Sequence, residues 1–331
     1  MFKDAEKKIY AAFQTLSQES KELYIPKEIP EIKSDAISPL IFYREYVSRN
    51  IPVIIRGGIK HWKAMDKWNI PYFRDKIGDK LVQVAVTPNG YADAIAKELP
   101  VSGTSDQEYF VMPEERHMKM KDFLDKLENP EESIYYIQRQ DSNFEEFSEL
   151  WRDVDNQISW ATEAFGTSPD AINFWMGDKR AVTSMHKDPY ENIYCVISGE
   201  KEFIIHPPTD LPWIPYNTYP LALYKEIQPG KWITEPTKKS DINDINEYNK
   251  SDQIPWIAVN PLSPDYNMYP KYKNVTKLIA KIGTGDIFYL PSLWFHHVKQ
   301  SHACVAVNYW YDMEYDIKYA YYKSLEVLCN S

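Results

Sequence analysis

The sequence predicts a mainly β protein whose core is a barrel or sandwich of eight antiparallel strands, flanked by helices. Three observations predict it. Between Ile172 and Tyr311, short apolar or alternating runs are separated by turn residues such as Ser198-Gly199-Glu200. Eight such runs match a double-stranded barrel. Aromatic residues make up 15% of the chain, which favours a packed sheet. The runs cover residues 172–176, 183–186, 193–197, 202–206, 278–282, 286–290, 293–298 and 304–311.

The first 140 residues mix helices with strands, which predicts an α/β extension over residues 1–130 that packs on the core. Apolar residues recur at three- and four-residue steps from Phe2 to Leu16, as in an amphipathic helix. Ser38 and Pro39 are typical of a helix start. That second helix would extend to Asn50 with an apolar face of Leu40, Tyr43, Tyr46 and Val47. Further strands are expected at 51–55, 81–86 and 134–138, and a helix at 120–127.

The core, residues 131–315, is interrupted by segment 207–274, which is rich in proline and tyrosine and includes a polar run from Lys238 to Asp252. A loop this long inside a compact domain usually has a function. We therefore interpret it as a lid or substrate-facing insert, with a plain surface loop as the alternative. The C-terminal segment 316–331 is expected to form an amphipathic helix that packs on the core or on a second subunit. Its apolar stripe comprises Ile317, Ala320, Tyr321, Ser324, Leu325 and Leu328.

Charge and cysteine content argue against several classes of protein. The net charge of −10 disfavours a nucleic-acid partner and suits a cationic protein or peptide better. The three cysteines include no CxxC pair, which indicates neither a disulfide framework nor a zinc knuckle and favours a reducing compartment. No signal peptide and no apolar run of membrane-spanning length is seen. We expect no membrane association and a cytoplasmic location, with entry into the nucleus left open.

A candidate metal site begins with His186 and Asp188, which point to the same side of an expected strand. Alone, such a pair is more often an ordinary surface pair. A third ligand is available from His296 or His297, which lie in a strand among aromatic residues, where a buried imidazole needs a polar partner. Strand periodicity allows only one of them to face the ion and does not choose between them. Two imidazoles and one carboxylate suit Fe(II), Mn(II), Co(II) or Zn(II), with coordination positions left open.

Lys201 is a candidate for binding the anion that would fill those open positions. It lies just beyond the turn at Ser198-Gly199-Glu200, 15 residues after His186. Inside the barrel its ammonium could pair with the distal carboxylate of a bidentate ligand. The alternative is a solvated surface charge, which is the more common role of a single lysine near a turn.

A series of motifs resembles those of a known family in order and spacing. They are Asn173-Phe174-Trp175-Met176-Gly177, Thr183-x-x-His186-x-Asp188-x-x-x-Asn192, Gly199-x-Lys201, Gly285-Asp286-x-x-Tyr289-x-Pro291-x-x-Trp294-x-His296-x-Val298 and Asn308-x-Trp310-Tyr311. These motifs resemble the JmjC-type (cupin-fold) 2-oxoglutarate oxygenases. The resemblance implies a jelly-roll core, also called a double-stranded β-helix.

The same resemblance implies roles for particular residues. It places Fe(II) on His186, Asp188 and His296, and so selects His296 over His297. It implies 2-oxoglutarate as cosubstrate, with ascorbate as a stimulant. The residues that would line the 2-oxoglutarate site are Tyr136, Thr183, Asn192, Lys201 and Asn308. Tyr135 is adjacent to Tyr136, and the register of that strand leaves the choice between them open.

Within the family, the chain is most similar to the small JmjC-only lysyl (3S)-hydroxylases that modify developmentally regulated GTP-binding proteins. This similarity is carried by Pro255-Trp256-Ile257 and by the runs from Leu293 to Val298 and from Asn308 to Asp316. It implies hydroxylation at C3 of a lysine in a GTP-binding protein, and a homodimer formed through the C-terminal helix. The alternatives are a histone lysyl demethylase, a histone-tail peptidase or a non-catalytic cupin-type binding module. The sequence does not identify an acidic residue that would bind the substrate lysine.

Overall fold

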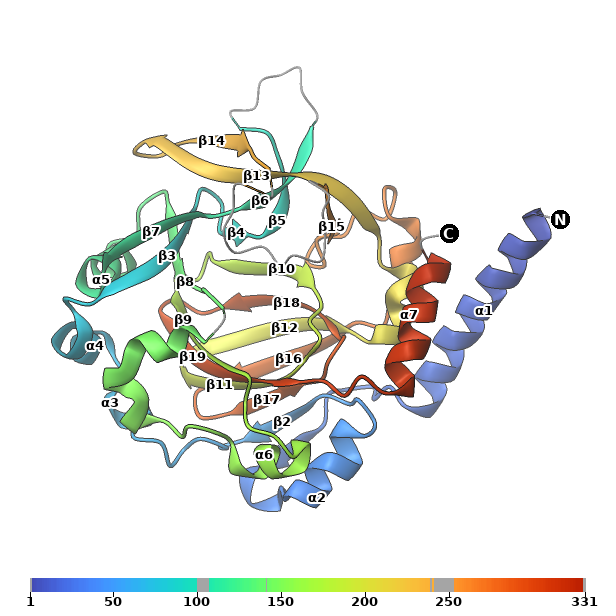
Figure 1. The fold of residues 1–331 in the computed structure, drawn as a ribbon, viewed down its shortest axis with the longest axis horizontal. Coiled ribbons are helices and arrows are strands. Elements are labelled where there is room, and N and C mark those ends of the chain that lie inside the picture. Colours follow the sequence, from blue (N-terminus) through green and yellow to red (C-terminus); the bar gives the residue numbers. More distant parts are fainter. Residues whose placement is uncertain (1, 100–106, 141, 239, 241–252, 330–331) are drawn as a thin grey trace.

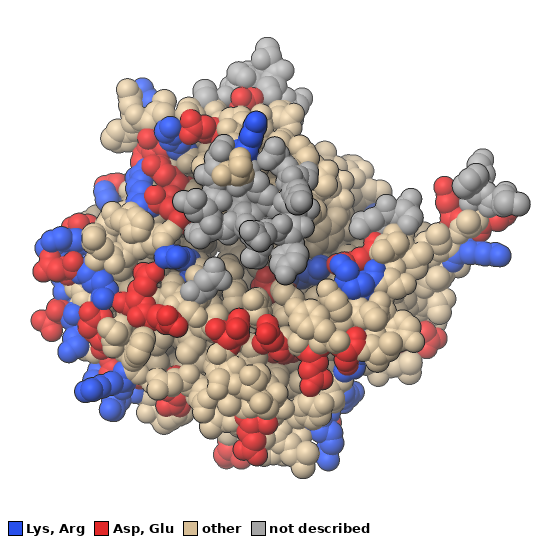
Figure 2. All heavy atoms as spheres, in the orientation of Figure 1, with Lys and Arg blue, Asp and Glu red and all other residues tan. Residues whose placement is uncertain are grey.

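The computed structural model describes residues 2–99, 107–140, 142–238, 240 and 253–329 of the 331-residue chain. A central strand-rich body is surrounded by helices, and helix α1 (Phe2–Leu23) projects from one side (Figure 1). None of the helices in these ranges is both long and apolar enough to cross a membrane. On the face drawn in Figure 2, Lys and Arg side chains are interspersed with Asp and Glu.

The eight expected core strands are all present and form two facing sheets. Strands β17-β11-β19-β9 are the centre of a nine-stranded sheet, and β16-β12-β18-β10 belong to a five-stranded sheet. Buried side chains of both sheets, such as Tyr194 and Phe203, share one core cluster. The predicted double-stranded β-helix is therefore confirmed. The strands are β9 (Ala171–Gly177), β10 (Val182–His186), β11 (Tyr190–Ser198), β12 (Glu200–His206), β16 (Leu278–Gly283), β17 (Ile287–Leu290), β18 (Phe295–Gln300) and β19 (Cys304–Asp312).

The predicted hairpin turn between β11 and β12 depends on a glycine. Gly199 has φ +86°, and a Cβ added there would lie 2.5 Å from Ser301 Oγ. A residue with a side chain would therefore meet both backbone strain and a clash. This turn places Lys201 on the first residues of β12, where the strand enters the barrel.

The N-terminal strands continue the barrel sheets instead of forming a separate layer. The nine-stranded sheet has the order β1-β2-β17-β11-β19-β9-β8-β3-β7, so the extension supplies both of its edges. β4 (Tyr91–Ala92) pairs in parallel with β10 at the edge of the five-stranded sheet. The added strands of the large sheet are β1 (Glu31–Lys33), β2 (Val53–Arg56), β3 (Leu81–Thr87), β7 (Glu114–Lys119) and β8 (Ile134–Ile137).

Short helices pack on the outer face of the nine-stranded sheet and enclose a second apolar core (Figure 1). Strand alternation gives this face to Ile193 and Tyr309, for example, while Tyr194 and Asn308 face the barrel interior. The covering elements are α2 (Pro39–Phe42), α3 (Ala64–Lys67), α4 (Ile70–Ile77), α5 (Met120–Glu128), the 3₁₀ segment Asn143–Asp153 and α6 (Ser159–Phe165).

The second predicted helix is shorter than expected, and its predicted apolar face is only partly right. Tyr46 and Val47 pack against the core, whereas Leu40 and Tyr43 are exposed. The Ser38 hydroxyl accepts a hydrogen bond from the Ile41 amide, as expected of an N-cap, but α2 gives way after Phe42 to a π-helical turn. Leu40 is 67% exposed, whereas Phe42 is fully buried. The Phe42 ring packs 4.7 Å from Trp160 and 4.8 Å from Tyr289, so tertiary contacts choose the face of this short helix.

Segment 207–274 contains three strands among its described residues, so the expectation of a long loop is wrong. Its strand β13 pairs with β14, with β15 and, in parallel, with β6 (Glu108–Met112), which itself pairs with β5 (Ala94–Lys97). The β13–β14 hairpin is local, but the pairings of β13 with β15 and β6 span long sequence separations and leave no local pattern. The prolines of the segment resemble turn signals. Most of the polar run 238–252 lies outside the described residues. The elements of the insert are β13 (Tyr216–Gln228), β14 (Lys231–Pro236), β15 (Gln253–Ile257) and two 3₁₀ turns at Pro208–Trp213 and Pro270–Asn274.

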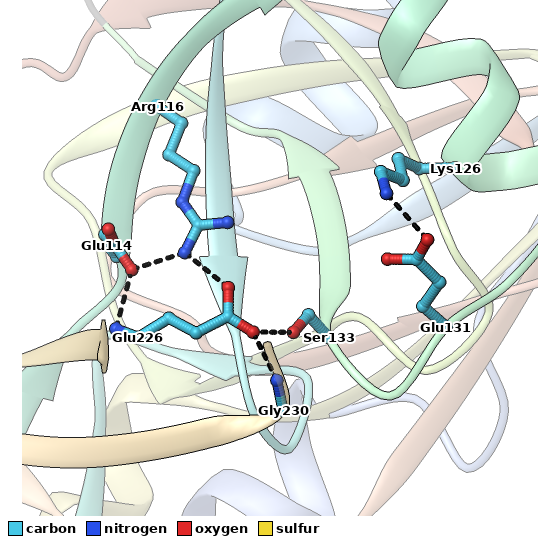
Figure 3. Close-up of polar contacts among 7 residues, drawn as sticks. All are labelled: Glu114, Arg116, Lys126, Glu131, Ser133, Glu226 and Gly230. Atoms are coloured by element: carbon cyan, nitrogen blue, oxygen red, sulfur yellow. Dashed lines mark hydrogen bonds and ion pairs between the residues drawn. The ribbon is translucent and has the colours of Figure 1, made fainter. Parts of the chain in front are cut away.

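A polar cluster holds the turn of the β13–β14 hairpin against β7 of the N-terminal extension (Figure 3). Arg116 Nη2 donates to Glu114 Oε2 at 2.6 Å and to Glu226 Oε2 at 2.7 Å. Glu226 Oε1 also accepts from Ser133 Oγ at 3.0 Å and from the Gly230 amide at 2.7 Å. Burial opposes ionisation of Glu226, but these donors keep the pKa of its carboxyl below the usual value. The insert is therefore fixed at one end above the barrel.

The C-terminal helix α7 (Ile317–Cys329) packs on the domain with a different face from the one predicted. Tyr322 is buried in the cluster beneath the insert, with Tyr319, Leu325 and Cys329 packed around it. Most of the predicted stripe faces solvent, and Tyr321 is 71% exposed. The chain therefore presents an apolar surface on α7 that its own core does not cover.

Candidate active site

His186, Asp188 and His296 converge on one point at the mouth of the barrel. His186 on β10 lies directly across from His296 on the neighbouring strand β18. Nε2 of each ring lies 3.5 Å from Asp188 Oδ2, and one ligand atom from each of the three residues falls within 4.8 Å of the others. The structure thus brings together the three residues expected to bind a metal.

Backbone carbonyls orient both imidazoles. His186 Nδ1 lies 2.8 Å from the Ser184 carbonyl oxygen, and His296 Nδ1 lies 2.9 Å from that of Trp294. A carbonyl oxygen only accepts, so each Nδ1 carries the hydrogen. The Nε2 lone pairs are therefore free and point toward Asp188, as metal-binding histidines require.

The charge state of the triad also suits a metal ion. Burial opposes ionisation of Asp188, but His186 and His296 lower the pKa of its carboxyl to about 2. Burial and the nearby His186 lower the pKa of His296 to about 4, so this ring is neutral at pH 7. The Leu293 amide donates to the Asp188 carbonyl at 2.8 Å and fixes the loop that carries the carboxylate. Two imidazoles and one carboxylate fit Fe(II) with open positions on the opposite side.

His297 is buried on the other side of β18, across from Ile204 of β12. Neither of its ring nitrogens has a hydrogen-bond partner among the described residues. The alternation of the strand therefore separates the two neighbouring histidines, and only His296 faces the triad.

Lys201 lies inside the barrel and is 1% exposed. Its Nζ donates to Tyr136 Oη at 2.9 Å and to Gln300 Oε1 at 2.5 Å, and no described carboxylate forms an ion pair with it. Burial lowers the pKa of this ammonium to about 8. A buried ammonium without a countercharge is costly unless a ligand supplies an anion. The site therefore fits a carboxylate of a small dicarboxylic ligand such as 2-oxoglutarate.

The register of β8 places Tyr136, and not Tyr135, beside Lys201. Tyr136 pairs with Gly177 of β9 and belongs to the cluster inside the barrel, whereas Tyr135 packs in the outer core. The choice that the sequence left open is thus made by the position of β8 in the sheet.

Three further buried side chains form a chain of hydrogen bonds across the inner face. Trp175 Nε1 donates to Asn308 Oδ1 at 2.8 Å, and Asn308 Nδ2 donates to Asn192 Oδ1 at 3.0 Å. These bonds fix both amides and leave Asn192 Nδ2 as a free donor for a ligand. Thr183, the remaining expected contact, lies on β10 across from Val298.

Sequence reasoning missed several residues that support the site. Gln300 lies four residues after His296, on the same face of β18, so strand alternation could have indicated it. Trp256 comes from the distant β15, and its indole lies parallel to the His186 ring, with centroids 6.0 Å apart and an interplanar angle of 7°. Its Nε1 donates to Ser184 Oγ at 3.0 Å. No local pattern in the chain predicts that the insert reaches the metal site.

Comparison with known proteins places this site in a family. A family model described as a cupin-like domain matches residues 39–317. The chain belongs to the cupin-like family. The relatives are JmjC proteins of this family, which confirms the resemblance drawn from the motifs. JmjC oxygenases depend on Fe(II) and 2-oxoglutarate, the two groups that the triad and the Lys201 site fit.

Three relatives match almost the whole chain. The chain is 43% identical over 312 residues to the human bifunctional peptidase and (3S)-lysyl hydroxylase JMJD7, covering 93% of this chain and 92% of that protein. It is 36% identical to JmjC domain-containing protein E of Dictyostelium discoideum, over 95% of this chain and 92% of the relative. It is also 36% identical to the lysine-specific demethylase JMJ32 of Arabidopsis thaliana, over 95% and 90% respectively.

Proposed function

We propose that the protein is an Fe(II)- and 2-oxoglutarate-dependent protein hydroxylase that adds a hydroxyl group to C3 of a lysine, with 3S stereochemistry. The observation that carries this proposal is the joint presence of the His186, Asp188 and His296 triad and the uncompensated Lys201 ammonium in one barrel. The similarity of the chain to a human (3S)-lysyl hydroxylase supports the choice of reaction. When bound, Fe(II) and 2-oxoglutarate activate dioxygen for C–H hydroxylation and release succinate and carbon dioxide.

The chain's own residues bind and orient these groups. His186, Asp188 and His296 would hold Fe(II), and Lys201 with Tyr136 would bind the distal carboxylate of 2-oxoglutarate. Asn192, fixed through Asn308 and Trp175, would donate to the same ligand, and Thr183 would line its site. Apolar side chains such as Phe203 and Val298 line the interior around them and limit the access of water. We expect ascorbate to stimulate turnover.

We also propose a polypeptide substrate, specifically a lysine in a GTP-binding protein. A groove of about 810 Å³ adjoins the triad through Lys187 and Pro255, the neighbours of His186 and Trp256 in the chain. Its lining is balanced in charge, with Glu108 and Glu326 beside Lys187 and Lys271. The net charge of −10 of the whole chain is what suits a basic peptide segment. Such a groove would hold residues on either side of the target lysine.

Mass spectrometry of peptides tests this function. We expect a lysine in one of a set of peptides tiled across a developmentally regulated GTP-binding protein to gain one oxygen atom. The reaction should require Fe(II), 2-oxoglutarate and dioxygen and should produce equimolar succinate. His186→Ala should remove both signals, because it deletes a metal ligand.

Other outcomes would replace this function with a named alternative. Loss of a methyl group from a methylated lysine would indicate a demethylase, the activity in the name of the Arabidopsis relative. Cleavage of the peptide would indicate a peptidase, an activity in the name of the human relative. Binding without succinate release from any peptide would indicate a non-catalytic cupin-type module.

We propose that the protein is a homodimer that contacts its partner through α7. Ile317, Tyr321 and Val327 are each more than 60% exposed on this helix. They adjoin an apolar groove of about 620 Å³ between α7, α1 and the π-helical turn Tyr43–Val47. Sedimentation velocity should give the mass of two chains, and Tyr321→Glu should yield the monomer; a monomer at all concentrations would contradict the dimer.

The three free cysteines support a reducing location. We propose that the protein is cytoplasmic, with entry into the nucleus left open, and cell fractionation would test this location.

A further inference from the structure

If the protein hydroxylates lysine, as proposed above, the site needs an acceptor for the substrate ammonium. Hydroxylation at C3 places the β-carbon of the substrate beside the metal. A short methylene chain separates this carbon from the ammonium, so the acceptor must lie close to the triad but away from the Lys201 side. A buried ammonium without a carboxylate or several carbonyl partners would bind poorly.

Asp93 lies in this position, attached to the strand that carries His186. It connects β4 to β5, and the preceding residue, Ala92, pairs with Thr183 of β10. The Ser184 hydroxyl donates to the Asp93 carbonyl at 2.6 Å. The carboxylate is close enough to His186 for each of the two groups to shift the pKa of the other.

Asp93 also has an unusual backbone conformation. Its φ is +55°, in the left-handed region that residues with side chains rarely adopt. Such a conformation persists only where surrounding contacts hold it, and it is frequent at binding sites. Here the pairing of β4 with β10 and the bond from Ser184 to the Asp93 carbonyl hold the backbone of Asp93 in place.

The Asp93 carboxylate lacks a cationic partner among the described residues. Its one hydrogen bond within the described structure comes from Gln138 Nε2 at 3.5 Å, and none of the described Lys or Arg side chains forms an ion pair with it. Burial raises the pKa of its carboxyl to about 6. The nearest positive charge that lowers this pKa is His186, whose Nε2 lone pair a metal would occupy. With metal bound, the carboxylate would remain half-buried and uncompensated, which an incoming ammonium would relieve.

Trp256 provides an apolar wall close to the backbone of Asp93. The Ser184 hydroxyl joins the two residues, because it accepts from Trp256 Nε1 and donates to the Asp93 carbonyl. Phe110 packs against the indole with a centroid distance of 4.6 Å, and His186 lies parallel to it. A rigid indole in this place can pack against the methylene groups of a lysine.

We propose that Asp93 binds the ammonium of the substrate lysine, with Trp256 packing against the methylene chain, and that this pair gives the site its preference for lysine. The negative charge of Glu115 on β7 raises the pKa of Asp93, and the Glu115 carboxylate itself accepts a hydrogen bond from Gln83 Nε2. It therefore serves as a matched control for the loss of one negative charge in the same region.

Equilibrium binding under nitrogen tests this assignment without turnover. The protein is loaded with Mn(II) and 2-oxoglutarate, and the probe is the tightest-binding lysyl peptide of the tiled set, alongside the same peptide with norleucine at the target. Asp93→Asn should lower the affinity for the lysyl peptide by at least about 30-fold and should leave the affinity for the norleucine peptide within about twofold of the wild type. Asparagine tolerates positive φ, so this variant should fold. Glu115→Gln should bind both peptides like the wild type, and Asp93→Glu should recover part of the affinity for lysine.

Two outcomes would overturn the assignment. Equal affinity of Asp93→Asn and wild type for the lysyl peptide would remove Asp93 from recognition, as would a wild type that binds lysine and norleucine peptides equally. An equal loss of affinity for both peptides in Asp93→Asn would indicate that Asp93 has a structural role. A wild type that hydroxylates no lysyl peptide would defeat the proposed function separately, because the binding comparison does not depend on turnover.

Discussion

Replacing His296 with alanine is expected to lower the affinity for Fe(II) by at least about 100-fold and to abolish hydroxylation, whereas His297→Leu should retain both. Loss of residues that merely support a metal ligand costs about 10- to 100-fold in affinity, so loss of a ligand should cost more. His297 faces away from the triad, and both of its ring nitrogens are buried without partners in the described structure. An apolar replacement of such a group is neutral or stabilising.

Calorimetric titration with Mn(II) under nitrogen measures these affinities, and thermal unfolding controls for the fold. We expect His297→Leu to unfold at the same temperature as the wild type or at a higher one. Equal metal affinity of His296→Ala and wild type would show that the metal binds elsewhere. Loss of Mn(II) affinity in His297→Leu alone would show that His297, and not His296, is the third metal ligand.

The second large effect is expected at Lys201. Lys201→Met should lower the affinity for 2-oxoglutarate by more than about 100-fold while Mn(II) affinity stays within about twofold. Methionine keeps the length of the side chain but removes the cation that would pair with the distal carboxylate. Folding should not suffer, because an unpaired ammonium buried between Tyr136 and Gln300 destabilises the free protein.

Lys299→Met is the matched control, because Lys299 lies on β18 next to Gln300 but pairs with Glu202 at the surface. It should bind 2-oxoglutarate like the wild type in anaerobic calorimetry. If Lys201→Met also bound 2-oxoglutarate normally, the buried ammonium would not be the anion site.

The same lysine should make binding of 2-oxoglutarate depend on pH. Burial lowers the pKa of Lys201 to about 8 in the free protein, so the ammonium loses its proton above this pH. A bound carboxylate favours the charged form and raises that pKa, so binding above pH 8 takes up a proton. Affinity should therefore fall by up to about tenfold per pH unit above 8, and Lys201→Met should lack this decline. A flat profile in the wild type would contradict the role of a titrating Lys201.

Strand positions in the core could be predicted because each strand satisfies a local rule. Apolar alternation and turn residues identify eight runs from Ile172 to Tyr311, and the glycine turn after Ser198 matches the hairpin before Lys201. The pair His186 and Asp188 was also visible, since residues two apart in a strand share a face. The sequence leaves two interpretations of Lys201 open, a position inside the barrel and a solvated surface charge, because a single lysine forms no periodic pattern.

Register decided what these local rules left open. Strand periodicity cannot decide which of His296 and His297 faces the barrel interior. The same holds for Tyr135 and Tyr136. The family resemblance selected His296 and left Tyr135 and Tyr136 open. The structure places His296 and Tyr136 on the barrel side, because β18 lies between β10 and β12 and β8 lies beside β9. A shift of one residue in either strand would reverse the choice in that strand.

By itself, the sequence determined the jelly-roll strands, the triad candidates and the oxygenase family, because each rests on residues close together in the chain or on the spacing of motifs. Only the tertiary structure decided the strand-rich insert, the exposed face of α7 and the neighbours of His186. Asp93, Trp256 and Gln300 come from three separate segments, and each acquires its role from a partner far away in sequence. Contacts of that kind are set by the packing of sheets and leave no trace in local composition. The His186-x-Asp188 pair could therefore be found in the sequence, but the groups that would select its substrate could not.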